Sequence, residues 1–233
     1  MDSSRFTLPD LPGVAVTLRR SARARRFSLR VSRLDGQVVL TLPTRAPLAE
    51  ALAFAQGHGE WLRRTLAAMP ALRRPTFGAT LPVEGEERRI EVGAVRAPRL
   101  EPGRLIVPPG EDRLATRLET FLRHCARLRL QAATERHAEV LGRPFRRITL
   151  RDTRSRWGSC AADGSLSYSW RLIMAPPAVL DYVAAHEVAH LAQMNHSPAF
   201  WAEVARLCPG HAAQRAWLRA QGQALHAYRF RDT

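Results

Sequence analysis

Three residues, His186, Glu187 and His190, form the pattern His-Glu-x-x-His, whose spacing suits metal chemistry. On an α-helix, positions i and i+4 lie on one face with Cβ atoms about 5–6 Å apart, so the two imidazoles can converge on one cation. Glu187 projects about 100° round the helix from His186 and can border the cation without ligating it. A carboxylate there can take a proton from a water molecule whose pKa a zinc ion lowers to roughly 7. The pattern therefore indicates a zinc site that activates water.

The context of the motif favours this interpretation over a chance match. The expected helix, roughly residues 177–194, is apolar almost all round, and such a helix is normally buried. A single buried histidine is usually a packing residue, but two histidines and a glutamate on one buried helix need a polar partner, because unpaired polar groups cost several kcal/mol in an apolar setting. A zinc ion meets that need.

A catalytic zinc usually has three protein ligands and one open position. His196 is the preferred third ligand, because Ser197-Pro198 reads as an N-cap followed by proline at N1 and so starts a new helix just after it. Cys160 is the alternative, since a strand beside the site could deliver a thiolate. Glu203 and His211 are weaker candidates.

Other polar residues could support the site, although each has a structural interpretation as well. Second-shell groups orient ligating imidazoles, and an acyl-transfer site needs a donor for its oxyanion. The candidates for the first role are Asn195, Ser197 and Asp181, and those for the second are Arg154, Arg156, Tyr168, Arg171 and Tyr182.

The composition is that of a globular protein of 233 residues, with 45% apolar and 24% charged residues. The net charge is +15 and all 36 cations are arginine. This charge is divided almost equally between the two halves, so a solvated basic surface is the simpler reading, although binding of nucleic acid is also permitted. No apolar run approaches the length of a membrane span, so no membrane binding is expected. No secretory signal is recognised, and three cysteines without ligand spacing favour a cytoplasmic protein.

The N-terminal half reads as β-rich with one helix. Alternating apolar residues predict strands, and Asp35-Gly36 predicts a hairpin turn. Pro108-Pro109-Gly110 is the best domain boundary, which gives domains of residues 1–110 and 111–233. The expected elements are strands at 14–18, 27–31, 38–42, 81–84, 88–92 and 104–107, and a helix at 47–68.

The C-terminal half reads as mostly helical around one short pair of strands. The segment 151–160 is expected to be a loop, and Asp163-Gly164 a turn before the return strand. Asp181 is expected in the first turn of the motif helix, where it would complement the helix dipole. The expected elements are helices at 111–141, 177–194, 198–208 and 211–226, and strands at 147–151 and 166–172.

Two segments resemble one known family. RDTRSRWGSC (151–160) and GSLSYSWRLIMAPPAVLDYVAAHEVAHLAQMNHSPAFW (164–201), with the arginine-rich 19–31, are similar to the YgjP-like bacterial metallopeptidases, which are related in motif to the SprT-like and Wss-type proteases. The resemblance implies a zincin-like domain in which His186, His190 and His196 ligate zinc and Glu187 is the general base. In that family an asparagine usually stands at the position of Ser169, which could alter a hydrogen bond beneath the site.

The sequence thus predicts an α+β protein with an N-terminal β-rich domain and a C-terminal zincin-like metallopeptidase domain. Its expected reaction is zinc-dependent hydrolysis of a peptide bond in a protein or peptide substrate, with a water molecule activated by Glu187. Two alternatives remain: a basic nucleic-acid-associated protein with a structural metal, and a non-peptide amidase that uses Cys160 as a ligand.

Overall fold

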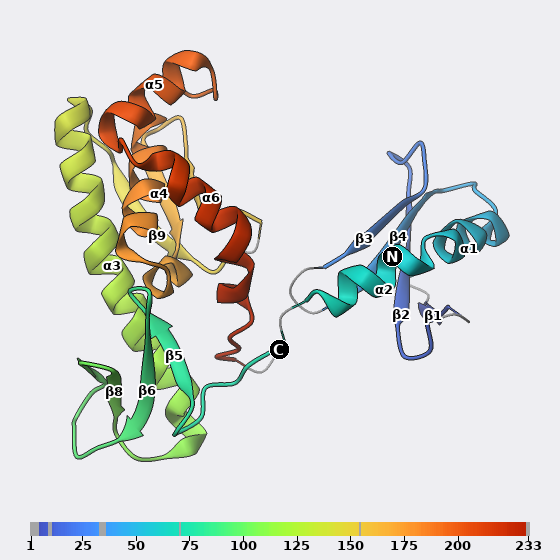
Figure 1. Ribbon diagram of the computed structural model, residues 1–233. Coiled ribbons are helices and arrows are strands. Elements are labelled where there is room, and N and C mark those ends of the chain that lie inside the picture. The colour runs from blue at the N-terminus through green and yellow to red at the C-terminus, as the bar shows by residue number, and fades with distance from the viewer. Residues whose placement is uncertain (1–4, 9–10, 33–35, 70, 154, 232–233) are drawn as a thin grey trace. The chain divides into compact units, whose positions relative to one another are not determined.

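The structure is a computed structural model that describes residues 5–8, 11–32, 36–69, 71–153 and 155–231. The chain forms two compact units, residues 1–71 and 72–233. Three small sheets and several helices make the protein α+β, which confirms the predicted class (Figure 1). No helix in the described ranges combines the length and apolar character needed to cross a bilayer.

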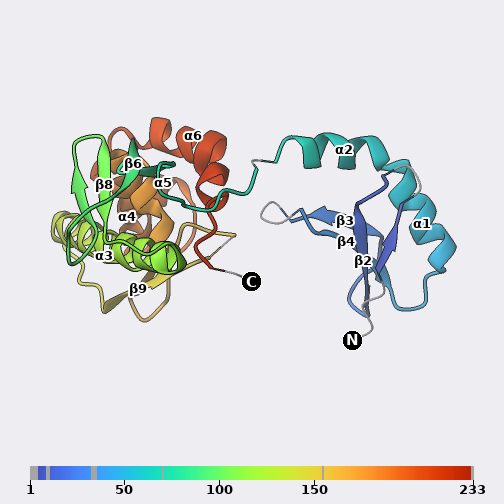
Figure 2. The ribbon, with the colours of Figure 1, turned by 90° about the horizontal axis from the view of Figure 1, so that it is seen from below.

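The first unit is a four-stranded sheet with two helices along one side (Figure 2). Strand β4 pairs parallel to β2 and antiparallel to β3, so the expected hairpin of the last two strands is present, while Asp35 of its turn lies outside the described residues. The strand order is β1-β2-β4-β3, formed by β1 (Arg5–Thr7), β2 (Ala15–Ser21), β4 (Val38–Pro43) and β3 (Ser28–Val31).

The single helix expected at 47–68 is instead two helices, α1 (Leu48–Gly57) and α2 (Gly59–Ala67). The break falls at His58, whose φ of −104° and ψ of 14° are not helical. Glycines flank His58 on both sides, and each weakens a helix by about 1 kcal/mol relative to alanine. The His58 ring instead donates from Nδ1 to the Phe54 carbonyl at 2.8 Å. The apolar spacing continues across the break, which is why one helix was expected.

The second unit is organised on one long helix, α3 (Leu114–Leu141), which carries a four-stranded sheet at one end (Figure 1). Gly142 ends α3 in the left-handed conformation, as expected for a C-terminal glycine. The sheet has the order β5-β6-β8-β7, and a short 3-10 turn leads from it into α3. Its strands are β5 (Thr80–Val83), β6 (Glu86–Val92), β8 (Arg104–Val107) and β7 (Arg99–Glu101). Strand β7 was not predicted from the sequence.

The division of the chain lies between residues 71 and 72, and not at the boundary expected after residue 110. Pro108 and Pro109 end β8, but their carbonyls accept hydrogen bonds from Arg117 of α3, at 3.1 and 2.6 Å. The turn between β5 and β6 also packs on the later chain, where Gly85 leaves no room for a Cβ against Pro176. The strands of this sheet therefore share one hydrophobic core with α3 and with everything that follows.

A second, three-stranded sheet of this unit has the order β10-β11-β9. Its strands are β9 (Arg147–Arg151), β10 (Gly158–Cys160) and β11 (Ser165–Ser169). The segment 151–160 was expected to be a loop, but its end forms β10 by pairing antiparallel to β11 across the Asp163-Gly164 turn. Strand β11 is parallel to β9 and stops at Ser169, because Trp170–Met174 turns into a 3-10 helix. The predicted return strand was thus three residues too long.

Four further elements complete the unit. Helix α4 (Pro177–Ala189) begins at the expected proline but ends before His190, about five residues earlier than predicted. Ser197 caps α5 (Pro198–Leu207) by accepting from the Phe200 N–H at 3.4 Å, as predicted. Helix α6 (His211–Gln221) and a 3-10 turn (Gly222–His226) replace the one helix expected at 211–226.

Asp181 does not lie in the first turn of α4, so its predicted interaction with the helix dipole is wrong. Its carboxylate instead binds two residues of α3, Arg136 at 2.8 Å and His137 at 3.0 Å. Burial raises the pKa of Asp181, but the hydrogen bond and charge of His137 and the charge of Arg136 outweigh it, so the pKa lies below its usual range. Asp181 therefore ties α4 to α3.

Arg171, one of the candidate oxyanion donors, instead has a structural role and organises the end of the chain. Its buried guanidinium donates to Asp152 at 2.6 and 3.1 Å and to the carbonyls of Leu225 and Tyr228 at 3.0 and 2.9 Å. It also lies 4.9 Å from the centre of the Trp170 ring. This one side chain joins β9, the 3-10 turn after β11 and the C-terminal segment.

We expect Arg171→Ala to lower the free energy of unfolding by about 3 kcal/mol, because it leaves buried carbonyl groups without donors and a carboxylate without its cation. Urea denaturation followed by circular dichroism measures this loss. The control is Arg89→Ala, an exposed arginine of β6, which should change the free energy by no more than about 0.5 kcal/mol. Equal losses in the two variants would contradict the assigned role.

Candidate metal centre

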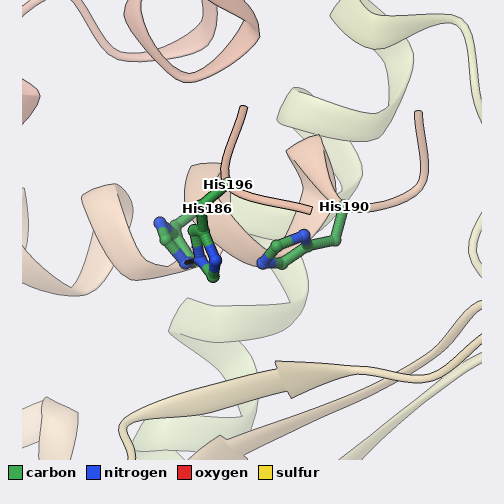
Figure 3. Close-up of side chains that lie close together, drawn as sticks. All are labelled: His186, His190 and His196. Carbon is green, nitrogen blue, oxygen red and sulfur yellow. Dashed lines mark hydrogen bonds between the residues drawn. The ribbon is translucent and has the colours of Figure 1, made fainter. Parts of the chain in front are cut away.

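Three histidines converge at the end of α4. They are His186, His190 and His196, and one ring nitrogen of each lies within 4.8 Å of those of the other two (Figure 3). This is the group of possible metal ligands found in the part of the chain that the structure describes. Nε2 of His196 lies 3.2 Å from Nε2 of His186. Two imidazoles of the motif and one from the following turn therefore face a common point.

Each of these histidines is placed by local structure. His186 lies in the last turns of α4, and His190 follows its last residue in a nearly helical conformation, with φ −64° and ψ −21°. His196 stands in the turn before α5, where Oδ1 of Asn195 accepts from the Ser197 N–H at 3.2 Å. Asn195 thus shapes the turn that carries the third histidine.

The two motif imidazoles are held neutral. Burial and the neighbouring charges of His190 and His196 lower the pKa of His186 to about 4. Burial is also the main cause that lowers the pKa of His190. Nδ1 of His190 donates to the carbonyl of Gln193 at 3.0 Å, which leaves Nε2 with its lone pair. Neutral imidazole nitrogens are the form that binds a metal.

Aromatic rings surround the three histidines, a feature the sequence analysis did not assign. The Phe200 ring stacks on His190, with centroids 4.4 Å apart and planes at 27°. The Trp201 ring lies 5.8 Å from that of His186 and 6.0 Å from that of His196. Both aromatics fall in the first turn of α5, directly after the third histidine, and this position is the signal that could have found them.

Glu187 is buried beside the histidines, on the side of α4 that faces β10. Burial raises its pKa to about 8, while the positive charge of Arg156 acts in the opposite direction. A Cβ at Gly158 would lie 2.5 Å from Cγ and 2.7 Å from Cδ of Glu187. Gly158 is therefore required for the close approach of β10 to this carboxyl group.

The alternative ligands lie elsewhere. Cys160 is outside the histidine cluster, and burial and the charge of Glu187 raise the pKa of its thiol to about 11, which keeps it protonated. Glu203 forms an ion pair with Arg206 at 2.8 Å. His211 is also outside the histidine cluster, and its ring stacks on that of Trp201, with centroids 6.1 Å apart.

The residues considered for the oxyanion fall into different environments. The Tyr168 hydroxyl is buried and lies 3.1 Å from Oγ1 of Thr134 on α3. Tyr182 packs its ring at 6.0 Å from His186. Arg156 is exposed and close enough for its charge to act on Glu187, and Arg154 lies outside the described residues. Ser169 is fully buried at the end of β11.

A family model described as "YgjP-like, metallopeptidase domain" matches residues 25–221. A search of curated proteins gave no match. One solved structure is similar over a limited region: the metallopeptidase zymogen of Pyrococcus abyssi abylysin, with 21% identity, 40% of this chain and 93% of that chain covered, and a TM-score of 0.36.

The contact between Gly158 and Glu187 predicts that Gly158→Ala lowers the free energy of unfolding by about 1–3 kcal/mol, because the added methyl group overpacks a filled site. In a Glu187→Ala background the same change should cost less than about 0.5 kcal/mol, because the clashing carboxyl group is gone. Urea denaturation of the four proteins of this cycle measures the coupling. Gly57→Ala, where a Cβ meets no atom within 4 Å, is the matched control. An equal cost in both backgrounds would contradict the contact.

Proposed function

The chain belongs to the YgjP-like family of metallopeptidase domains, and from this premise we propose that it hydrolyses peptide bonds with a zinc ion held by His186, His190 and His196. The observation that carries the proposal is the convergence of three imidazole nitrogens within 4.8 Å. We propose further that the second unit is zincin-like, with α4 as its motif helix. The substrate would be a protein or a peptide.

The three histidines fit zinc. Zinc–nitrogen bonds of about 2.0–2.1 Å in a tetrahedral site separate two ligating nitrogens by roughly 3.3 Å, and the Nε2 atoms of His186 and His196 already lie 3.2 Å apart. Three imidazole nitrogen donors with one position left open are a ligand set of catalytic zinc sites. When bound, the zinc ion would lower the pKa of a water molecule to roughly 7 and polarise the substrate carbonyl.

Glu187 is the proposed general base and then general acid. Its carboxylate accepts a proton from the attacking water at an Oε atom and releases it to the nitrogen of the leaving amine. Burial raises its pKa to about 8, and the charge of Arg156 favours the ionised form. These opposed effects suit a group that must both take and return one proton near neutral pH.

Strand β10 is the proposed support for the substrate backbone. It is the outer strand of the sheet order β10-β11-β9, so one edge of β10 is unpaired within its sheet. An extended polypeptide can add to such an edge through backbone hydrogen bonds. Because Gly158 of β10 contacts Glu187, a segment held there would pass the proposed base. Arg156, two residues before this strand, is the better candidate for the oxyanion, since Tyr168 is already paired with Thr134.

We expect Glu187→Gln to keep a full equivalent of zinc and to lose casein hydrolysis by about 10²–10⁴-fold, the usual contribution of a general acid–base. Zinc is measured by elemental analysis and hydrolysis by release of labelled peptides. The matched control is Glu203→Gln, a carboxylate paired with Arg206, which should retain both. Unchanged hydrolysis in Glu187→Gln would refute the mechanism.

We expect His196→Ala to weaken zinc binding by at least about 100-fold, because losing a ligand costs more than losing a group that merely orients one, which costs 10–100-fold. Cys160→Ala should keep the zinc, since this thiol lies outside the cluster. Competition with a chromogenic chelator measures both affinities, and His211→Ala serves as a histidine control. The reverse pattern, with zinc lost from Cys160→Ala alone, would assign the site to a different ligand set.

A further inference from the structure

The outer face of the β9–β11–β10 sheet holds a cavity of about 590 Å³ that the proposed reaction does not use. Because successive side chains of a strand point to opposite faces, every second residue of each strand lies on this face. Arg147, Thr149 and Arg151 of β9 share it, and the pairing of Ser165 with Arg147 and of Ser167 with Thr149 brings serines alongside. The floor is therefore made of small hydroxyl groups, and the rim of arginines.

The arginines of this cavity are unpaired. Arg147, Arg151 and Arg156 are exposed, and no carboxylate among the described residues forms an ion pair with them. Among the described residues that line the cavity, the carboxylate is that of Asp163, which Arg146 already binds at 2.6 Å. Elsewhere in this unit exposed arginines such as Arg104, Arg129 and Arg136 do have acidic partners. Positive charge without an acidic partner thus borders a polar floor, in which Ser165 donates to Asp163 and Thr153 to the Arg156 carbonyl, and which Thr149, Ser159 and Ser167 complete.

This cavity adjoins the proposed active site. Ser159 lies in its lining, and the residue before it, Gly158, contacts Glu187. Arg156, two residues before Gly158 in the chain, also lines the cavity. Strand β9 lies two strands from β10, or roughly 10 Å, which an extended chain spans with about three residues.

We propose that this cavity binds a run of acidic side chains in the substrate polypeptide, about three or more residues from the cleaved bond. The proposal rests on the proposed peptidase function, since it assigns that function a class of substrate. Guanidinium groups bind carboxylates through paired, charge-assisted hydrogen bonds. The described residues of the lining include no aromatic side chain on which a base could stack, and binding of single-stranded nucleic acids draws on such stacking. An acidic polypeptide therefore fits the cavity better than a nucleic acid.

The test is binding of a fluorescein-labelled deca-glutamate peptide to the full chain, followed by fluorescence anisotropy at about 0.1 M salt, where surface charges are partly screened. Arg147→Gln with Arg151→Gln should weaken binding by about tenfold. The matched control, Arg89→Gln with Arg113→Gln, removes the same charge from exposed arginines outside the cavity and should change binding less than about twofold. Equal losses in the two double variants, or no binding by the wild type, would overturn the proposal.

A second variant and a second probe sharpen the test. Ser167→Glu places a negative charge on the floor without altering any arginine and should weaken binding of the peptide by a similar factor. Labelled oligo(dT) of 20 nucleotides tests the other polyanion. Loss of oligo(dT) binding with intact peptide binding in the cavity variants would assign the face to nucleic acid and overturn the proposal. Because binding needs no hydrolysis, a failure here is distinguishable from inactivity, which would count against the peptidase function.

Discussion

The approach of β10 to α4 is the contact on which the site depends. Helix α4 is buried on nearly all sides, and it carries Glu187, whose side chain is buried with it. The backbone of Gly158 fills that space and leaves no room for a side chain. A carboxyl group enclosed in this way gains a raised pKa from desolvation, so a packing constraint sets its proton affinity.

The remaining elements hold this contact in place. Asp181 joins α4 to α3, while the turn at Gly85 packs against Pro176, just before α4 begins. Arg171 links the end of β9 to the C-terminal segment, and β10 is attached to the same sheet through β11. The helix and the strand are therefore each tied to neighbouring elements, so a small displacement of either is opposed by these ion pairs, hydrogen bonds and close contacts. Such support would suit the proposed role of Glu187, since proton transfer depends on precise positioning.

Sequence reasoning was most reliable where the geometry is local. The histidine cluster followed from i, i+4 spacing and from a capped helix start at Ser197-Pro198, both of which depend on neighbouring residues. It failed where contacts are distant. The strand Gly158–Cys160 has little strand propensity and exists by pairing with β11, and the Pro108-Pro109-Gly110 turn signal could not reveal that β5–β8 share a core with α3. The end of α4 was missed because the apolar pattern continues past Ala189.

Electrostatics separates the two faces of the β9–β11–β10 sheet. On the helix side, desolvation holds the motif imidazoles neutral and favours a protonated carboxyl group. On the outer side, arginines keep their full charge in water above a floor of hydroxyl groups. A charge is costly on the first face and stable on the second. A net charge of +15 can therefore coexist with neutral motif imidazoles, because partly or fully exposed arginines act on the site residues only from a distance: Arg215 lowers the pKa of His186, and Arg156 favours the ionised form of Glu187.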